Sequence, residues 1–465
     1  MVNLPNGYPR ITPSSPVRDL GPGCMDYERC AALHNELLTR AVKARGLEMP
    51  PNPRTWWEVF SPSEDIVEIL CDGLIEFYKR AYDTEVLGDG YLFYFLGGMI
   101  PPKGLMEGAA HSFDTPRFLE IYQHSWFRGL DDEGLFFDQE TGQASWIEDW
   151  NDTMAVCTHE WGWLPLEVIL DAYLQMHDEG KAEALPPSRL KDLRSTYPGP
   201  VDPWIPIHQY TEIDINRAVT AFQRLINAID SRLENKNECT SSYIDLPWHD
   251  PVTLAQDFIP GNSFAHRFLQ AVYQWKVRFR YIAPGIRLPT VSEFLDQPIK
   301  VFGDSRYRHL ATFPSDGPLQ IFQINAEHTV QDSVYNIDLP AGVYIDRVMP
   351  ESWFFWSNGC RVLLPFRIRA KGWARHSNGQ PFVINNFNED VRPHDRNGAI
   401  YQARFTNGIT TNHFVQINKV LNNWADRVKM GDWDVTEDGV AGGIEKFKEA
   451  DTEEHWKKYW IPPAW

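Results

Sequence analysis

The chain has 465 residues, of which 43% are hydrophobic and 23% charged, as is usual for a folded globular protein. Its 63 acidic residues outnumber its 44 basic ones and give a net charge of −19, which opposes non-specific binding to DNA or to an anionic membrane surface. Six cysteines are dispersed without a C-x-x-C pair, so the sequence shows neither the pattern of a disulfide-stabilised scaffold nor that of a zinc knuckle. Neither a signal-type leader nor a run of 18 apolar residues is present, so we expect a cytoplasmic protein.

The N-terminal part is rich in proline and glycine, which predicts an extended arm over residues 1–55. A Ser-Pro-Ser-Glu sequence at residues 61–64 combines a cap, a proline and a glutamate before an apolar run. This pattern predicts a helix over residues 62–82. Apolar residues that recur every three or four positions predict two further helices, at 165–177 and 211–233.

Because 465 residues exceed the usual size of one core, we expect two lobes. The first lobe is mainly helical and spans residues 56–240. A polar stretch at 234–239 and the prolines after it place the boundary near residues 235–260. The second lobe then spans residues 260–465.

In the second lobe, basic and apolar residues alternate with the period of a strand over residues 275–281 and again over 364–371. Short β-like runs at 319–324 and 341–348 add to a sheet, and a helix is indicated by the spacing of Ile417, Leu421, Trp424 and Val428. The predicted fold is therefore α+β, a helical N-terminal lobe packed against a sheet-containing C-terminal lobe.

The two alternating runs would each place cations on one face of a strand about every 7 Å, close to the spacing of backbone phosphates. The residues concerned are Lys276, Arg278 and Arg280 in the first run, and Arg367, Arg369 and Lys371 in the second. They are candidates for binding RNA locally within an acidic protein. The alternative is a solvated sheet face whose cations are neutralised by neighbouring carboxylates.

The widely shared catalytic motifs are missing from the sequence. It has no G-x-x-x-x-G-K-[ST] phosphate loop, no G-x-G-x-x-G, no G-x-S-x-G and no H-E-x-x-H, so no cofactor and no metal are expected. One alternative stays open, because His394, Asp395 and His413 could be assembled by the fold into a non-haem iron site.

The C-terminal stretch 439–465, GVAGGIEKFKEADTEEHWKKYWIPPAW, is the most unusual part of the sequence. On a continuous helix from Ile444, Asp451 and His455 would share one face, with Glu454 at its edge. Inward carboxylates suit acid–base work or the binding of a cationic substrate. Equally, residues 451–454 are typical of a capping box that begins a new helix. The terminal WIPPAW is apolar and should dock onto the body.

This stretch, together with FRYIAPGIRLPT at 279–290, resembles a family of fungal proteins, the arginine-containing cyclodipeptide synthases. The resemblance implies an enzyme of fungal secondary metabolism that takes arginine from arginyl-tRNA, joins it to a second amino acid from another charged tRNA and releases a diketopiperazine. It also implies an acidic D-x-x-E element. Asp451 and Glu454 match that element and are the favoured catalytic pair, although residues 65–68 and 434–437 match it too.

Three functions are thus carried forward. The first is tRNA-dependent cyclodipeptide synthesis, in which the charged tRNA supplies an activated ester and removes the need for an ATP site. The carboxylates would hold a guanidinium or deprotonate the attacking amine. The second is an iron-dependent tailoring oxygenase, and the third is a binding or scaffold protein without catalysis.

Overall fold

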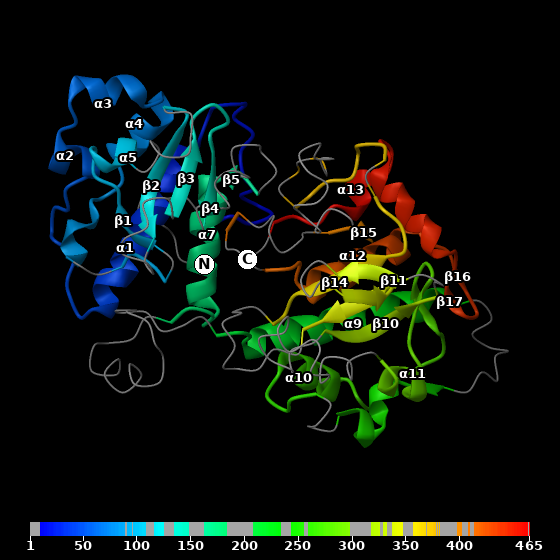
Figure 1. Cartoon of the computed structure of the whole chain (residues 1–465). Helices are drawn as coiled ribbons and strands as arrows, with labels where there is room; N and C mark the ends of the chain where they lie inside the picture. Colours follow the sequence, from blue (N-terminus) through cyan, green and yellow to red (C-terminus); the bar gives the residue numbers. More distant parts are fainter. Residues whose placement is uncertain are drawn as a thin grey trace. The chain divides into compact units, whose positions relative to one another are not determined.

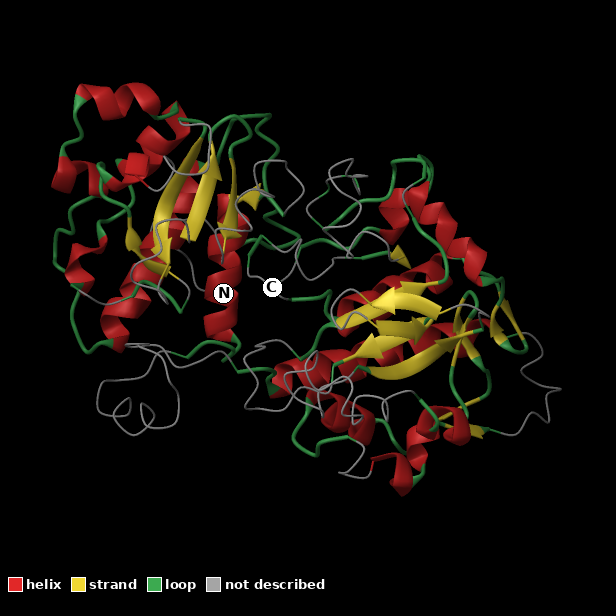
Figure 2. Ribbon diagram, in the orientation of Figure 1, coloured by secondary structure: helices red, strands yellow, loops and turns green. Residues whose placement is uncertain are grey.

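The computed structural model shows an α+β protein, with helices and sheets in both halves of the chain (Figure 2). It describes residues 10–88, 91–94, 96–107, 116–124, 134–147, 162–183, 208–233, 243–254, 259–297, 318–325, 329–332, 337–346, 357–368, 370–377, 379, 381, 398–401, 408–409, 413–463 and 465. Two compact units are formed, of which the first contains Met1–His208, Phe405–Thr411 and Trp465. The second contains Gln209–Arg404 and Asn412–Ala464. The division at His208 thus lies before the long helix 211–233 and not after it, as the sequence suggested.

The first unit contains a five-stranded antiparallel sheet in which the strands follow one another in chain order (Figure 1). The strands are β1 (Leu96–Met99), β2 (Phe118–His124), β3 (Gly134–Asp138), β4 (Gln143–Ile147) and β5 (Leu164–Pro165). In β3 all five residues are buried, so this strand lies in the core and is covered on both faces. The first unit therefore combines the helices that the sequence suggested with a sheet that it did not predict.

Helices cover this sheet, and the longest of them was not predicted. They are α1 (Tyr27–Ala44), α2 (Trp56–Phe60), α3 (Glu64–Ile69), α4 (Asp72–Tyr78), α5 (Gly104–Glu107) and α7 (Leu166–Asp178), with a 3₁₀ turn η1 (Thr84–Leu87). Helix α1 packs against α7 and α4 and buries Leu33, Leu37 and Leu38. The expected extended arm over residues 1–55 is therefore wrong, because its second half is a core helix that begins at the Asp26 cap.

The single helix expected over residues 62–82 is also wrong, since α3 ends at Ile69 and α4 begins at Asp72. The side chain of Gln139 explains the break. Its Oε1 accepts the backbone N–H of Cys71 at 2.6 Å, and its Nε2 donates to the carbonyl of Ile69 at 2.8 Å. These bonds replace the helical bonds of this turn, so a residue distant in the sequence ends the helix.

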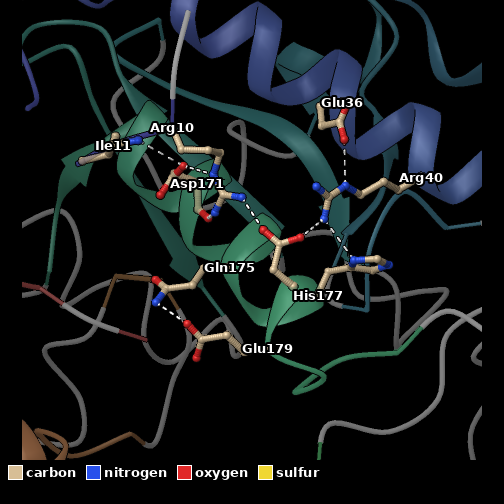
Figure 3. A network of polar contacts seen from close by, with 9 residues as sticks. Arg10, Ile11, Glu36, Arg40, Asp171, Gln175, His177 and Glu179 are labelled. Carbon is tan, nitrogen blue, oxygen red and sulfur yellow. Dashed lines mark hydrogen bonds and ion pairs between the residues drawn. The ribbon is translucent and has the colours of Figure 1, made fainter. Parts of the chain in front are cut away.

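A network of ion pairs holds the start of the described chain on α7 (Figure 3). The guanidinium of Arg10 binds the Asp171 carboxylate and donates to Asp178 Oδ2 at 2.6 Å. Arg40 of α1 donates to the other oxygen of Asp178 at 2.6 Å and contacts His177 Nδ1 at 3.0 Å. Asp178 therefore joins two guanidinium groups, and their charges lower the pKa of its carboxyl group against the opposing effect of burial.

The first unit is completed by residues from the far end of the chain. The backbone N–H of Trp146 in β4 donates to the carbonyl of Gly408 at 2.9 Å, and Tyr173 Oη donates to the carbonyl of Ile409 at 2.9 Å. Ile409 is buried, and so is Trp465, whose ring lies under the ammonium group of Lys181. The predicted docking of the apolar C-terminus is confirmed by the burial of Ile461 and Trp465.

The second unit is built on an eight-stranded mixed sheet of order β15-β14-β13-β10-β9-β8-β17-β16. These strands are β8 (Tyr281–Ala283), β9 (Ile286–Arg287), β10 (Leu319–Ile324), β13 (Gly342–Ile345), β14 (Cys360–Leu364), β15 (Gly398–Ala399), β16 (Val435–Thr436) and β17 (Gly439–Val440). All pairs are antiparallel except β17 and β8, which run parallel. Two small sheets pair β6 (Ile244–Asp245) with β7 (Lys276–Val277), and β11 (Thr329–Asp332) with β12 (Ile337–Pro340).

Two long helices, α9 (Glu212–Arg232) and α12 (Ile417–Met430), pack on each other in this unit (Figure 1). Helix α9 begins with a capping box formed by Thr211 and Asp214, and α12 ends at Gly431, whose φ of 80° suits glycine. Shorter helices are α10 (Phe264–Ala271), α11 (Val291–Leu295), α13 (Trp456–Tyr459), η3 (Pro247–His249), η4 (Pro251–Leu254) and η9 (Ile444–Asp451). Helix α9 also contacts β8, β16 and β17 and closes the core.

Several predicted elements are confirmed with small shifts of their ends. They are the helices now seen as α7, α9 and α12 and the strands β10 and β13. Within the part of the chain that the structure describes, every helix is too short or too polar to cross a lipid bilayer.

Candidate functional site

The two segments that carry the family resemblance lie against each other. Strand β17 pairs in parallel with β8, and Asp438 O accepts the backbone N–H groups of Arg280 and Tyr281 at 2.9 and 3.0 Å. A Cβ atom added to Gly439 would lie 2.3 Å from the carbonyl oxygen of Tyr281, and φ at this glycine is 107°. Only glycine fits here, so the close approach of residues 279–290 to 439–465 is built into the sequence.

A second glycine brings the same segments together one turn further on. A Cβ atom on Gly285, in the turn between β8 and β9, would lie 2.4 Å from the backbone nitrogen of Ile444. The φ of Gly285 is 68°, a conformation that L side chains rarely adopt. The start of η9 is therefore seated directly on the β8–β9 turn.

The continuous helix expected from Ile444 is not formed. The chain makes the 3₁₀ helix η9, becomes extended at Thr452 with φ −131° and ψ 147°, and then forms α13. A capping box at residues 451–454 is not formed either, because the residue before α13 is His455 and no side chain caps this helix. The break separates the surroundings of Asp451 from those of Glu454.

Asp451 is buried, with 4% of its surface exposed, as the prediction of an inward carboxylate requires. Its Oδ2 accepts the backbone N–H of Lys371 at 2.7 Å, and its Oδ1 accepts those of Trp373 and Ala374 at 2.7 and 3.0 Å. A carboxylate that accepts hydrogen bonds from three N–H groups is held in one orientation, and these bonds compensate for the loss of hydration on burial. Asp451 therefore orders the loop 371–374, and both of its oxygens are occupied by that loop.

Glu454 lies in a different environment, because 84% of its side chain is exposed. Its carboxylate contacts His455 Nε2 at 3.6 Å. The expectation that Glu454 points inward with Asp451 is thus wrong, since the extended Thr452 turns the chain outward. The acidic residues of the other two D-x-x-E matches, at 65–68 and 434–437, are exposed as well.

The first basic run does not form one strand. Lys276 belongs to β7, whereas Tyr281 begins β8 in the other sheet. Lys276 Nζ pairs with Asp245 at 3.0 Å, and the Arg278 guanidinium pairs with Asp230 at 2.9 Å. These two cations are neutralised, as the alternative interpretation proposed. Arg280 is exposed, and no carboxylate of the described chain pairs with it.

The second basic run leaves the sheet after Leu364, where β14 ends. Arg367 is exposed on the bend that follows, and Lys371 is exposed on the loop that Asp451 holds. Arg369 lies outside the described residues. The prediction of a continuous basic strand face over 364–371 is therefore wrong, because Pro365 and the bonds to Asp451 turn the backbone away from the sheet.

Three residues near Asp451 were not among the predicted site residues. Trp373 and Arg375 lie on the ordered loop, and Trp456 is the first residue of α13. The arginine guanidinium lies 5.8 Å from the ring centroid of Trp373 and 5.1 Å from that of Trp456. The W-x-R spacing in 373–375 was the signal available in the sequence. The second ring, that of Trp456, is 81 positions after Arg375, and only the fold brings the two together.

The alternative iron site is incomplete in the described chain. His413 is buried, and its Nε2 contacts Asn358 Oδ1 at 3.0 Å, while Asn358 Nδ2 donates to Asp214 at 2.9 Å. His394 and Asp395 lie outside the described residues. Among the residues that are described, no three His, Cys, Asp or Glu side chains gather in a way that could hold a metal ion.

No known family model, no curated protein and no solved structure matches this chain. The chemistry must therefore be inferred from the arrangement of its own residues.

Proposed function

We propose that this protein is an aminoacyl-tRNA-dependent cyclodipeptide synthase that produces an arginine-containing diketopiperazine in fungal secondary metabolism. The observation that carries the proposal is the direct contact between the segments 279–290 and 439–465. These are the two segments that resemble the family, and about 150 residues separate them in the chain. Their contact supports the proposal, because residues that one active site would need lie close together in the fold.

The reaction needs two amino acids that are already activated as esters of tRNA. The α-amino group of the first aminoacyl-tRNA attacks the ester carbonyl of the second, a peptide bond forms, and the second tRNA leaves through its 2′- or 3′-hydroxyl. The α-amino group of the second residue, now at the N-terminus of the dipeptide, then attacks the ester to the first tRNA, which closes the ring and releases that tRNA. Each attack requires that an ammonium group lose one proton, and a carboxylate can accept it. The reaction would take place in the cytoplasm, where charged tRNAs are present.

In this proposal the two carboxylates have different roles. Glu454 is exposed, and among the described residues its carboxylate contacts only His455, at 3.6 Å, so its oxygens are available to a guanidinium or to an attacking amine. Asp451 acts as a positioning residue, because its oxygens already bind the loop 371–374. Arg280 and Arg367 are exposed cations of the same unit and are available to tRNA phosphates.

The test is a reconstitution with purified protein, arginyl-tRNA carrying labelled arginine and a mixture of other aminoacyl-tRNAs. We expect a labelled diketopiperazine by mass spectrometry, and we expect ribonuclease treatment of the tRNA to abolish it. Free arginine with ATP should give no product. Absence of labelled product from all aminoacyl-tRNA mixtures, with a protein that is folded by circular dichroism, contradicts the proposal.

Two variants test the separate roles. Glu454→Gln should lower the rate by roughly 10²- to 10⁴-fold, the usual worth of a positioned acid–base group, without a change in melting temperature. Asp451→Asn should lower both activity and stability, because an amide NH₂ would face the N–H donors of the loop and a buried unsatisfied group costs about 1–3 kcal/mol. Glu453→Gln, on the neighbouring exposed residue, is the matched control and should retain activity.

A further inference from the structure

The Arg375 guanidinium has no carboxylate partner within ion-pair distance in the described part of the chain, although the protein has a large excess of acidic residues. Its Nη1 donates to the carbonyls of Gly372 and Ala374 at 2.7 and 3.2 Å. The carboxylate of Asp451 acts on this guanidinium through its charge, but its oxygens accept three backbone N–H groups instead. The N–H groups on Nε and Nη2 of Arg375 therefore have no acceptor among the described residues, and they can donate to a bound ligand.

Burial makes this charge costly. Arg375 is half-buried between Trp373 and Trp456, and desolvation lowers its pKa against the opposing field of Asp451. Contact with two ring faces compensates part of the lost hydration, since a cation over an indole gains roughly 0.5–2 kcal/mol. A planar guanidinium that lies over rings and keeps two donor nitrogens open is suited to an oxyanion such as a phosphate.

Two further cations belong to the same two segments. Lys371 is exposed at the start of the loop, and Lys457 follows Trp456 with its ammonium group 5.7 Å from the indole centroid. Neither has a carboxylate partner within the described residues. The other lysines of the C-terminal segment differ, since Nζ of each pairs with a neighbouring carboxylate; these are Lys446 with Glu449, Lys448 with Glu445 and Lys458 with Asp432. Lys457 of this segment and Arg375 of the loop therefore both lie over the Trp456 ring, and Lys371 lies two residues before Trp373.

The position of the loop is fixed by the C-terminal segment. The three bonds to Asp451 hold its first half, and Trp460 Nε1 donates to the carbonyls of His376 and Ser377 at 2.9 and 3.1 Å. Arg375 is thus presented by a loop that is anchored at both ends. A prearranged site of this kind loses little conformational entropy when a ligand binds.

We propose that the loop 371–377 and Trp456 form a binding site for the single-stranded 3′ end of an RNA. Its phosphates would be held by Arg375, Lys371 and Lys457, and a base would stack on the half-buried indoles. Positive groups interleaved with aromatic rings are the usual means of binding an unpaired strand. The inference rests on the proposed function in one respect, that the RNA is the acceptor end of a charged tRNA.

The test uses fluorescence anisotropy with a 5′-labelled tetranucleotide, ACCA, and the full-length protein. Replacement of the stacking ring by Trp456→Ala should weaken binding about 5- to 150-fold, which corresponds to roughly 1–3 kcal/mol per stacked base. Arg375→Ala should weaken binding at least about tenfold and lower the slope of log K against log salt by about 0.7, the value for one phosphate contact to a single strand. Arg375→Lys should restore the slope but not the affinity.

Arg267→Ala is the matched control, because Arg267 is a half-buried arginine of the same unit that, unlike Arg375, pairs with a carboxylate, that of Glu212 at 2.7 Å. It should bind the tetranucleotide like the wild type. Unchanged affinity in both Arg375→Ala and Trp456→Ala, with melting temperatures equal to the wild type, overturns the site. Equal affinity for AMP and for the tetranucleotide also overturns it, since the ligand would then be a free nucleotide and not a strand.

The two proposals fail in different ways. If wild-type protein forms no diketopiperazine but binds ACCA through Arg375, cyclodipeptide synthesis is refuted and the RNA site stands. If Arg375→Ala still forms the product at the wild-type rate with limiting aminoacyl-tRNA, the assigned RNA site is refuted and the synthase proposal stands.

Discussion

Asp451 has a structural role that its side chain performs through hydrogen bonds to the backbone. One buried carboxylate receives three backbone N–H groups and so fixes a loop that lies about 80 residues earlier in the chain. The sequence singled out this residue for its neighbourhood, and its burial was expected. Its hydrogen-bond partners could not be predicted, because every residue except proline has a backbone N–H group and the sequence does not show which of them meet a given carboxylate.

His34 leads to a prediction of pH dependence. It is fully buried in α1, where its Nε2 donates to the Tyr82 carbonyl at 2.8 Å and its Nδ1 accepts from the Tyr122 hydroxyl at 2.8 Å. Burial lowers the pKa of the imidazole from 6.5 to about 4. As the pH falls from 6.5 to 4, the unfolded chain takes up a proton that the folded chain refuses, so stability is complete above 6.5 and decreases below it.

The expected loss approaches roughly 3 kcal/mol at pH 4, from about 1.4 kcal/mol for each pKa unit. Urea unfolding between pH 7.5 and 4.5, followed by hydrogen exchange in peptides of α1, measures it. His34→Gln removes the titrating group and should reduce the pH slope of the first unit in this range. An identical slope in the variant would show that His34 does not contribute.

At the scale of elements, regular helices and strands could be predicted wherever their own residues determine them. Helices α7, α9 and α12 follow from apolar spacing, and α9 also from its capping box. The errors have distant causes. Gln139 breaks the helix at 70–71, and Asp451 and Pro365 end the second basic run. The alternation of Lys276, Arg278 and Arg280 resembled one strand, but β7 ends at Val277 and β8 of another sheet begins at Tyr281, so both arginines lie between the two strands.

The junction of β8 and β17 gives a prediction at this scale. Gly439→Ala places a methyl group 2.3 Å from the carbonyl oxygen of Tyr281 at a φ of 107°, so we expect a loss of about 1–3 kcal/mol from backbone strain and in addition a weakened strand pair. Chemical denaturation measures the loss, and the diketopiperazine synthesis that we propose should fall with it. Gly443→Ala is the matched control, since its φ is −88° and no atom lies within 4 Å of the added carbon. It should stay within about 0.5 kcal/mol of the wild type.

At the scale of the whole molecule, the division of the chain into units does not follow its order. The first unit takes Phe405–Thr411 and Trp465 from beyond the second, and Gly408 O completes the bonding of β4. The expected boundary near 235–260 was wrong in part for this reason, because composition along the chain cannot report which distant residue pairs with a strand. It was also placed after α9, although this helix covers the sheet of the second unit.

We therefore predict that a fragment of residues 1–208 does not reach the native fold alone. It lacks the carbonyl that pairs with Trp146 N–H and the buried side chain of Ile409. It should bind a hydrophobic dye and melt without a sharp transition. The same fragment joined through a flexible linker to residues 405–411 should recover cooperative melting in part. Equal melting curves for the two fragments would contradict the prediction.

This arrangement has a consequence for synthesis on the ribosome. About 200 residues separate His208 from Thr411, and at roughly 5–20 residues per second their translation takes on the order of 10 to 40 seconds. During that interval the edge of β4 and the surface that receives Ile409 stay uncovered in the nascent chain. Chaperones that shield newly made polypeptides should therefore bind the N-terminal half for longer than its length alone requires, and faster elongation should improve the yield of folded protein.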